Sequence, residues 1–392
     1  MLPELRKAYN RDFLEEKYSA FEFELYTAQK YSLDFRVSET PLFLSKELTD
    51  SLVAASHEIL GQVTTPEYLQ ASKQAVPPDF RVPGEDDHPL FVQVDFAICK
   101  DETGRFVPRL IELQGFPSLY CYEVFLDDMW RKHFTIPSGF TPYFGGLNRE
   151  TYIEQLRKAI VGDHNPEQVI LLEIHPEKQK TRIDFACTEQ YLGIPTVNLT
   201  DLIVRGKNVY YMQEDVEIPV KRIYNRVIFD ELAKKKVTSE FDFRKEYNLT
   251  WAGHPQWFYR ISKFSLPHIK SKYCPPCQFL DGLDKYPRDL KNYVLKPLFS
   301  FAGYGVEINV TPGMLDALPD PKNYILQRKV EYAPLVETPE GYSRCEIRMM
   351  FLWKDKPMLV NNLVRMSKGA LMGVAYNTNK TWIGSSLAYH PS

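Results

Sequence analysis

Residues 294–310 read VLKPLFSFAGYGVEINV. An apolar run ends in lysine and proline, a loop of small residues follows, and a second alternating run begins after the glycines. A Walker loop places lysine directly after its second glycine, but here Gly305 is followed by Val306. A dinucleotide-binding turn needs a further glycine three residues on, where this chain has Ile308. A kinase glycine loop precedes its lysine, so this stretch fits none of these three phosphate-binding patterns.

The remaining interpretation is a strand at residues 293–296 whose last side chain, Lys296, reaches a polyphosphate covered by loop 299–306. Glycines in that loop can adopt φ > 0 and bring backbone N–H groups close to phosphate oxygens. A hairpin with a bulged turn explains this stretch equally well, so the rest of the chain must decide. The loop residues expected to contact the nucleotide are Ser300, Gly303 and Gly305.

Composition restricts the class of partner. The 392 residues suffice for roughly two or three domains, with 44% hydrophobic and 25% charged residues as in ordinary globular proteins. A net charge of −3 offers no polycation for nucleic acid or a membrane surface. No apolar run of about 18 residues is present, and the charged, amphipathic start differs from a signal peptide. We therefore expect a cytoplasmic protein with small-molecule partners; the sequence does not determine its oligomeric state.

The six cysteines are too few for a disulfide framework in so long a chain. Cys274 and Cys277 form one CPPC, which could be a redox pair or half of a metal site. Without a second pair or a histidine at ligand spacing, a loop carrying two inert thiols is the preferred interpretation.

The pattern of elements predicts a mixed fold of the α+β or α/β class. Residues 1–90 carry helical periodicity, and residues 91–147 open with two β-like runs joined by a glycine turn. Residues 148–254 alternate helical and strand-like runs, among them a helix at residues 149–160 and a strand at residues 218–228, which predicts a parallel or mixed sheet covered by helices. Residues 255–392 return to strands around the glycine loop, with a helix expected at residues 256–266. We expect these four segments to correspond to the units of the fold.

The two β-like runs carry a possible metal site. In VQVDFAICKDETGRFVPRLIELQGFPS, residues 92–118, antiparallel pairing can bring Asp95 and Glu112 onto one face of a hairpin. Such like charges are unfavourable unless a cation lies between them. Gln114 lies on the same face as Glu112 and adds an amide oxygen, so the set suits Mg²⁺. The alternative is a solvent-exposed hairpin with scattered acids.

A second lysine strengthens the prediction of a nucleotide site. Lys263, in RISKFSLP at residues 260–267, precedes Lys296 in the chain. Two separated lysines, a glycine loop and a hairpin suited to a hard metal ion together predict an ATP site.

Taken together, these segments resemble the ATP-grasp superfamily. Lys263 and Lys296 match its two nucleotide lysines, and Asp95, Glu112 and Gln114 match its metal-binding strand pair. YILQRKVEY, residues 324–332, resembles the hinge that hydrogen-bonds adenine. The resemblance implies that adenine meets Gln327 and the backbone of Lys329 and Val330, and that Glu331 meets the ribose.

The metal segment precedes the glycine loop, an order that resembles the circularly permuted branch containing glutathionylspermidine synthetase-type ligases. The resemblance covers about residues 90–390. LVRMSKGALMGVAYNTNKTWIG, residues 363–384, resembles the final segment of that branch, in which Arg365 and a late asparagine face the phosphates. The implied fold is a circularly permuted ATP-grasp with an adjoining β/α domain and an N-terminal helical segment.

Two residues depart from the family pattern. Gln93 stands where an arginine usually stabilises the transferring phosphoryl group, and Gln114 replaces the usual asparagine but keeps an amide oxygen. Loss of such an arginine can cost several orders of magnitude in phosphoryl transfer. Arg109, Arg348 or Arg365 are the candidates to replace it.

The resemblance implies an ADP-forming carboxylate–amine ligase that uses ATP and Mg²⁺ and passes through an acyl phosphate. Lys263, Lys296 and Arg365 would neutralise the developing charge. Arg226, at the end of a predicted strand in the β/α region, is a candidate to hold the substrate carboxylate, against the alternative of a surface arginine. Three rivals remain open: a nucleotide-binding protein without ligase activity, a small-molecule phosphotransferase, and an adaptor that binds no nucleotide.

Overall fold

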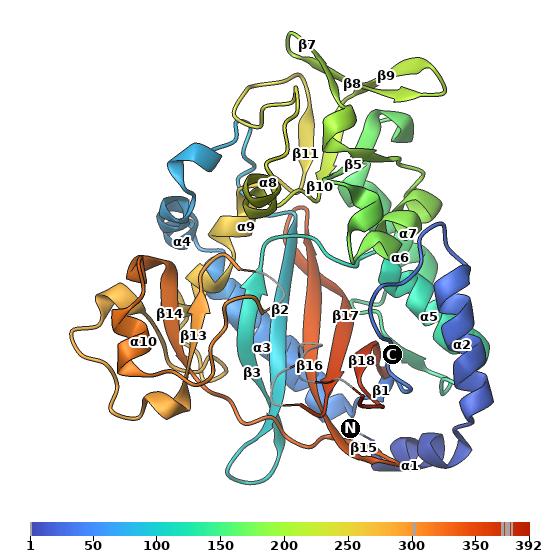
Figure 1. Cartoon of the computed structure of the whole chain (residues 1–392). Helices are drawn as coiled ribbons and strands as arrows, with labels where there is room; N and C mark the ends of the chain where they lie inside the picture. The colour runs from blue at the N-terminus through green and yellow to red at the C-terminus, as the bar shows by residue number, and fades with distance from the viewer. Residues whose placement is uncertain (1, 301–302, 370–371, 373–376, 378) are drawn as a thin grey trace.

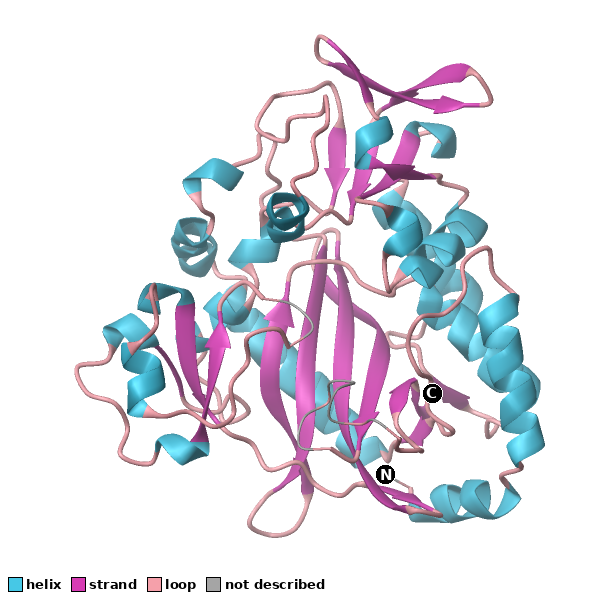
Figure 2. Cartoon of the chain, in the orientation of Figure 1, coloured by secondary structure: helices cyan, strands magenta, loops and turns pink. Residues whose placement is uncertain are grey.

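The computed structural model describes residues 2–300, 303–369, 372, 377 and 379–392. Over these residues the fold is mixed α+β, with its strands arranged in five sheets (Figures 1 and 2). In the part of the chain that the structure describes, no helix has the length and apolar character needed to cross a membrane.

The largest sheet joins segments from the two halves of the chain. Its strand order is β18-β17-β16-β2-β3, with β15 paired to β16, and every pairing is antiparallel. The hairpin β2–β3 therefore lies beside strands that follow it by more than 200 residues (Figure 1). The bounds are β2 Phe91–Lys100, β3 Phe106–Gln114, β15 Val336–Thr338, β16 Gly341–Trp353, β17 Pro357–Ser367 and β18 Gly384–Ser386.

The two faces of this sheet differ in chemistry because side chains alternate along each strand. In β2, Val92, Val94 and Phe96 are buried on the face that packs against helix α3, Lys46–Val63. The intervening residues Gln93 and Asp95 lie on the opposite face. That second face carries the polar residues of the candidate site.

A small antiparallel sheet stands next to β3 (Figure 1). Its order is β12-β14-β13, and Leu295, Leu326 and Leu315 share a core cluster under it. The predicted strand at residues 293–296 is confirmed as β13, Tyr293–Pro297. The other bounds are β12 Cys277–Phe279, β14 Tyr324–Arg328 and helix α10 Pro312–Asp316.

The predicted β/α alternation is confirmed as a four-stranded parallel sheet of order β11-β10-β5-β6. The predicted helix at residues 149–160 is α6, Arg149–Ile160, which begins at an Asn148 capping box. The bounds of the strands are β5 Val169–Glu173, β6 Thr196–Asn198, β10 Arg222–Asn225 and β11 Thr250–Ala252, and the neighbouring helices are α5 Tyr122–His133, α7 Arg182–Leu192 and α8 Phe229–Lys235.

Two predicted elements differ from the structure. The single strand expected at residues 218–228 is two strands, because the chain leaves the antiparallel sheet β7-β8-β9 after Val220 and enters the parallel sheet at Arg222. The helix expected at residues 256–266 is helix α9, Trp257–Arg260, followed by the 3-10 helix η6, Lys263–His268. The Ser262 capping box starts a new helix there, so one continuous helix does not form. The remaining strands of this region are β7 Ile203–Arg205, β8 Asn208–Gln213 and β9 Val216–Val220.

The N-terminal segment is held against the end of the chain. Strand β1, Leu42–Phe43, pairs in parallel with β19, Ala388–Pro391, which in turn pairs with β4, Phe140–Thr141. Helix α2 packs beside α5. Both termini lie on the same side of the large sheet (Figure 1). The helices of this segment are α1 Pro3–Asp12, α2 Glu15–Thr27 and α4 Pro66–Ala71.

Candidate functional site

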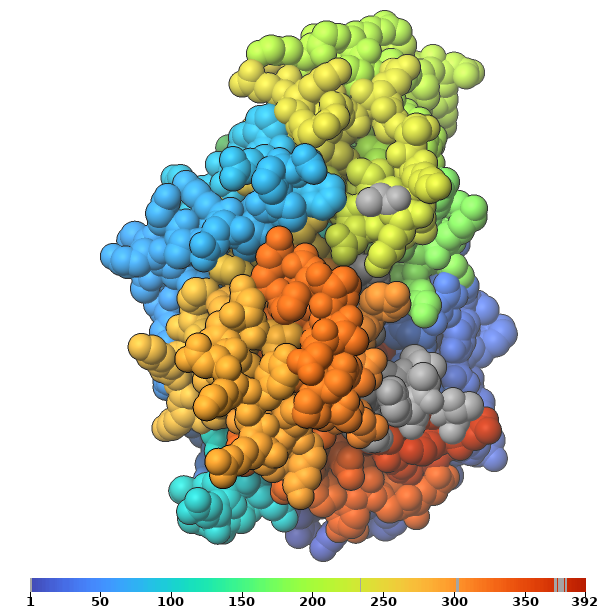
Figure 3. Space-filling view, turned by 60° about the vertical axis from the view of Figure 1, so that its left-hand side comes forward, coloured from blue at the N-terminus to red at the C-terminus, as the bar shows by residue number. Residues whose placement is uncertain are grey.

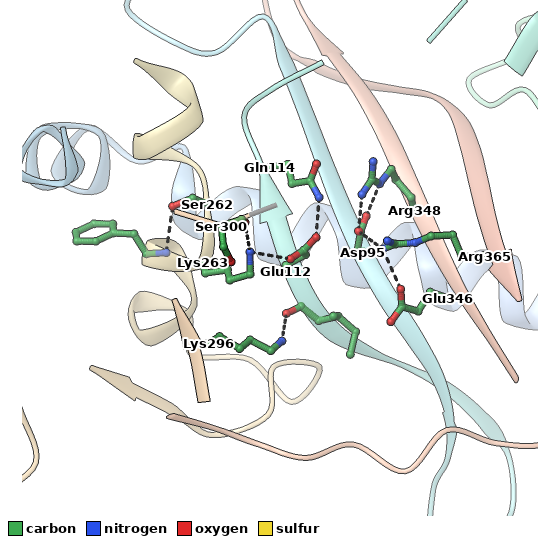
Figure 4. A network of polar contacts seen from close by, with 12 residues as sticks. Asp95, Glu112, Gln114, Ser262, Lys263, Lys296, Ser300, Glu346, Arg348 and Arg365 are labelled. Carbon is green, nitrogen blue, oxygen red and sulfur yellow. Dashed lines mark hydrogen bonds and ion pairs between the residues drawn. The ribbon is translucent and has the colours of Figure 1, made fainter. Parts of the chain in front are cut away.

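The candidate site lies where the polar face of the large sheet meets the small sheet and η6 (Figure 4). Side chains of both signs gather there from β2, β3, β13, β16, β17 and η6. Figure 3 shows the amber and orange segment that carries the small sheet packed against the light-blue N-terminal segment on one side of the molecule. The cations of the site are Lys263, Lys296, Arg348 and Arg365, and its carboxylates are Asp95, Glu112 and Glu346.

Asp95 is bound by two arginines. Arg348, opposite it on β16, donates Nε and Nη2 to the two carboxylate oxygens at 2.6 and 2.7 Å. Arg365 on β17 donates Nη2 to the second oxygen at 2.8 Å. Because Asp95 is 1% exposed, these charge-assisted bonds replace its hydration.

Arg365 links Asp95 to a residue that the sequence interpretation missed. Its Nη2 lies 2.9 Å from Oε2 of Glu346, and Tyr332 donates its hydroxyl to the other oxygen of Glu346. Burial opposes the charge of Arg365, but Glu346 and Asp95 raise its pKa above the ordinary value. Arg365 is therefore a fixed cation, and its side chain keeps 35% of its surface exposed toward the site. Its register partner on β16, Glu346, could have been recognised as a charged residue two places before Arg348, on the same face of the strand.

Glu112 on β3 connects the sheet to η6. Lys263 Nζ lies 3.2 Å from its Oε2, and Gln114 donates Nε2 to its Oε1 at 2.6 Å. Burial would raise the pKa of Glu112, but Lys263, Arg365 and Lys296 together hold that pKa well below its usual range. Glu112 is consequently ionised at physiological pH and is paired with Lys263.

Lys296 projects from β13 toward β3 and donates Nζ to the carbonyl oxygen of Ile111 at 2.9 Å. It is 6% exposed. Burial lowers the pKa of its ammonium group, and Glu112 partly restores it. The structure thus brings the two predicted lysines together around one carboxylate.

The glycine loop begins beside these lysines. Lys263 donates Nζ to the carbonyl oxygen of Ser300 at 2.6 Å. Gly303 and Gly305 have φ of +73° and +70°, and a Cβ on Gly305 would come within 2.8 Å of Pro297 Cγ. Position 305 therefore requires glycine for two reasons, the positive φ and the lack of room for a Cβ beside Pro297. Residues 301–302 of the predicted loop, and residues 370–371, 373–376 and 378 of the predicted C-terminal phosphate segment, lie outside the described residues.

The predicted adenine hinge follows β14. Gln327 is buried and donates its side-chain amide to the carbonyl oxygen of Leu110 at 3.3 Å, which ties the small sheet to β3. The N–H of Lys329 donates to the carbonyl oxygen of Asn292 at 2.8 Å. Val330 is half-buried and Glu331 is exposed. The predicted contact from the Lys329 N–H would have to replace its bond to Asn292.

A magnesium ion fits part of the predicted donor set. Among the described residues, no group of three or more His, Cys, Asp or Glu side chains is placed to hold a metal. Both oxygens of Asp95 are bound by arginines, and both oxygens of Glu112 are also engaged, one by Lys263 and the other by the side-chain nitrogen of Gln114. A magnesium ion at Glu112 and Gln114 would have to replace one of these contacts. One or two carboxylates, completed by phosphate oxygens and water, are sufficient for Mg²⁺.

Arg226 lies away from this cluster, directly after β10 at the carboxyl end of the parallel sheet. It is 4% exposed, so it is not the surface arginine of the alternative reading. Its guanidinium lies 5.0 Å from the ring of Phe116 and 5.5 Å from that of Phe185. Nη2 donates to Thr181, whereas Nε and Nη1 have no partner among the described residues. The unpartnered edge is suited to a carboxylate.

The position expected to hold an arginine is Gln93. It is completely buried and donates Nε2 to the carbonyl oxygen of Ser118 at 2.9 Å. Of the three candidates to replace an arginine there, Arg348 and Arg365 reach the site through Asp95. Arg109 instead donates its guanidinium to the carbonyl oxygen of Lys272.

The cysteine pair stands behind Lys296. Cys274 and Cys277 are half-buried free thiols, and burial raises the pKa of Cys274 to about 11. Neither thiol is in a disulfide, and burial also raises the pKa of Cys277. The geometry agrees with two inert thiols.

Neither a family model nor a curated protein matches this chain. Among solved structures, the chain is similar to a glutathione synthetase-like effector from Globodera pallida in its apo form, with a TM-score of 0.59 and 12% sequence identity. The match covers 97% of each chain. At this identity the likeness shows the fold alone. Over nearly its whole length, the fold of this chain is therefore similar to that of a glutathione synthetase-like protein.

Proposed function

We propose that this chain is an ATP-dependent ligase that joins a carboxylate to an amine through an acyl phosphate and releases ADP and phosphate. The supporting observation is the convergence of Lys263, Lys296 and Arg365 on one face of the large sheet, around the ionised Glu112 (Figure 4). The glutathione synthetase-like fold supports a nucleotide-dependent ligase of the ATP-grasp type.

The two lysines bind the phosphates of ATP. Each ammonium group is now held by a main-chain carbonyl oxygen, Ser300 for Lys263 and Ile111 for Lys296. A phosphate oxygen is a stronger acceptor than a carbonyl, so ATP replaces these bonds when it enters. The carbonyl oxygen of Ser300, at the start of the glycine loop, would then lose its bond to Lys263.

Glu112 and Gln114 would hold the Mg²⁺ that accompanies ATP, and such an ion would supply positive charge to the phosphates. The substrate carboxylate attacks the γ-phosphate, and Arg365 offsets the charge that develops on the transferring group. Asp95 and Glu346 orient Arg365. Covering the site excludes water, which would otherwise hydrolyse the acyl phosphate.

Arg226 holds a carboxylate of the acid substrate. Its guanidinium is positioned between two phenylalanine rings and presents Nε and Nη1 without partners. A buried cation with unpartnered donors is costly unless an anion completes it. The proposed reaction has two small-molecule partners, an acid and an amine.

Titration calorimetry with ATP, with and without Mg²⁺, is the first test. We expect Mg²⁺-dependent ATP binding in wild type. Lys296→Met should bind ATP at least tenfold more weakly, because it lacks the buried ammonium group that would contact a phosphate. Lys322→Met is the matched control, since Lys322 is exposed and lies shortly before β14 of the small sheet. Wild-type protein with ATP, Mg²⁺ and hydroxylamine is then screened against carboxylic acids, with ADP and hydroxamate as products.

The burial of Gln93 supports a second candidate function, a nucleotide-binding protein without ligase activity. The amide of Gln93 is engaged with Ser118 and supplies no positive charge to a phosphoryl group. This alternative predicts Mg²⁺-dependent ATP binding but neither ADP nor hydroxamate from any acid. Absence of ATP binding would exclude both functions.

A further inference from the structure

Tyr332 connects the predicted adenine hinge to the large sheet. It directly follows Glu331, and its backbone pairs with Cys99 of β2 in an isolated antiparallel bridge. The next residue, Ala333, donates its N–H to the carbonyl oxygen of Ile98 at 2.8 Å. Strand β2 therefore fixes the backbone of Tyr332.

The hydroxyl of Tyr332 completes a chain of contacts that ends on the same strand. It donates to Oε1 of Glu346 on β16, whose Oε2 lies 2.9 Å from Nη2 of Arg365 on β17. The same Nη2 donates to Oδ2 of Asp95 on β2 at 2.8 Å (Figure 4). Glu346 and Arg365 are thus each held from two directions.

These contacts leave donors of Arg365 free. Both carboxylates meet Nη2, whereas Nε and Nη1 have no hydrogen-bond or ion-pair partner among the described residues. Nε and Nη1 carry three of the five N–H donors of a guanidinium, and phosphate oxygens are strong acceptors for such donors. Because the guanidinium is planar and rigid, the direction of the free donors depends on where Nη2 is held.

Glu346 needs its negative charge to hold Arg365. Burial raises the pKa of Glu346, and both Arg365 and the hydroxyl of Tyr332 oppose that rise. Loss of the hydroxyl would remove a donor from Oε1 and favour the protonated form of Glu346. A neutral carboxyl group binds a guanidinium more weakly than a carboxylate does.

We propose that Tyr332 is a positioning residue for the γ-phosphate of ATP, which holds Glu346 in place so that Arg365 directs its free donors to that phosphate. This inference rests on the proposed ligase function and adds to it a residue outside the cluster of lysines and arginines. Tyr332 acts through Glu346 and Arg365, and no bond to Tyr332 forms or breaks in the reaction.

The difference between ATP and ADP binding tests this proposal, because only ATP carries the γ-phosphate. Calorimetry with Mg²⁺ gives the Kd of each nucleotide for the full chain, and we expect wild type to bind ATP more tightly than ADP. Tyr332→Phe, which removes only the hydroxyl, should reduce that preference about fivefold and leave the Kd of ADP unchanged, as expected for the loss of one hydrogen bond. An unchanged preference, or an equal weakening of both nucleotides, would overturn the proposal.

A double-mutant cycle with Glu346→Gln tests whether Tyr332 acts through Glu346. We expect Glu346→Gln alone to reduce the preference for ATP at least as much as Tyr332→Phe does. In the Glu346→Gln protein, Tyr332→Phe should then cause less than about a twofold further loss. A further loss as large as that in wild type would mean that Tyr332 acts independently of Glu346, against the proposal.

Tyr120→Phe is the matched control. Tyr120 is buried and donates its hydroxyl at 2.9 Å to the carbonyl oxygen of Phe351, also on β16, which is a main-chain acceptor and not a carboxylate. We expect Tyr120→Phe to keep the wild-type preference for ATP over ADP. A loss as large as that of Tyr332→Phe would show that any buried hydroxyl on this strand has the effect, and the specific role of Tyr332 would be wrong.

Failure of the ligase function is recognised separately. If wild type binds no ATP, the proposed function and this inference both fail. If wild type binds ATP and ADP equally, or if Tyr332→Phe retains the wild-type preference for ATP, only this inference fails.

Discussion

Arg348 forms a bidentate ion pair with Asp95, donating Nε and Nη2 to its two carboxylate oxygens. The two residues are 253 positions apart in the chain. Removing one member of such a buried pair leaves the other charge unpaired. We expect Asp95→Ala to lower the free energy of unfolding by about 3–5 kcal/mol, measured by urea denaturation.

The double variant Asp95→Ala/Arg348→Met should recover a large part of that loss, because it removes the unpaired cation as well. A double variant that is less stable than Asp95→Ala by the full cost of Arg348→Met would show that the two residues act independently.

The glycine loop offers a matched pair of variants. Gly303→Ala introduces only the backbone cost of a positive φ, since its Cβ would meet no atom within 4 Å. Gly305→Ala adds a clash with Pro297. We therefore expect ATP affinity, measured by calorimetry, to fall about tenfold further in Gly305→Ala than in Gly303→Ala, in keeping with strain of about 1–3 kcal/mol. Equal affinities would mean that nucleotide binding does not require this loop conformation.

Arg226→Ala should raise the KM for the acid substrate about 10- to 100-fold, because a charge-assisted hydrogen bond contributes about 1.5–3 kcal/mol. The effect on kcat should be smaller, since Arg226 lies away from the lysines and arginines around Glu112. Arg222→Ala on the same strand is the control, as its guanidinium bonds the carbonyl oxygens of Ala159 and Ile160. A normal KM in Arg226→Ala would remove Arg226 from the substrate site.

Glu173 makes stability depend on pH. Burial raises its pKa to about 8 from a usual value near 4.5, and Arg226 opposes the rise. Below pH 4.5 the group is protonated in both states. Between these two values the unfolded chain releases the proton that the folded chain keeps, so stability is lost as pH rises.

We expect the free energy of unfolding of wild type to fall relative to Glu173→Gln by roughly 3–5 kcal/mol between pH 4.5 and 8. Urea denaturation over a pH series measures it, and parallel pH curves for the two proteins would contradict it.

Local patterns in the sequence predict much of this fold. The two β-like runs identified the hairpin of β2 and β3, and the helical pattern of RETYIEQLRKAI, residues 149–160, predicted α6. The order of Lys263 and Lys296 indicated a shared nucleotide site, and the structure brings both lysines to Glu112. These features depend on residues close in sequence or on spacings that a strand or helix fixes.

The contacts that the sequence did not predict depend on pairing between segments that are distant in the chain. That Asp95 faces Arg348 follows from the register of β2 with β16, which one sequence alone does not reveal. Likewise, the division of residues 218–228 into β9 and β10 arises from a change of partner strand, not from any break in apolar periodicity.

Because β2 and β3 share a sheet with β16, this sheet can form only late in synthesis of the chain. The hairpin leaves the ribosome before its partner strand exists, and at about 5–20 residues per second the wait is roughly 10–50 s. Throughout that interval Asp95 lacks both of its arginines and β2 offers an open edge to other chains. The proposed nucleotide site, which draws on β3, β13 and β17 together, is therefore complete only when nearly the entire polypeptide has been made.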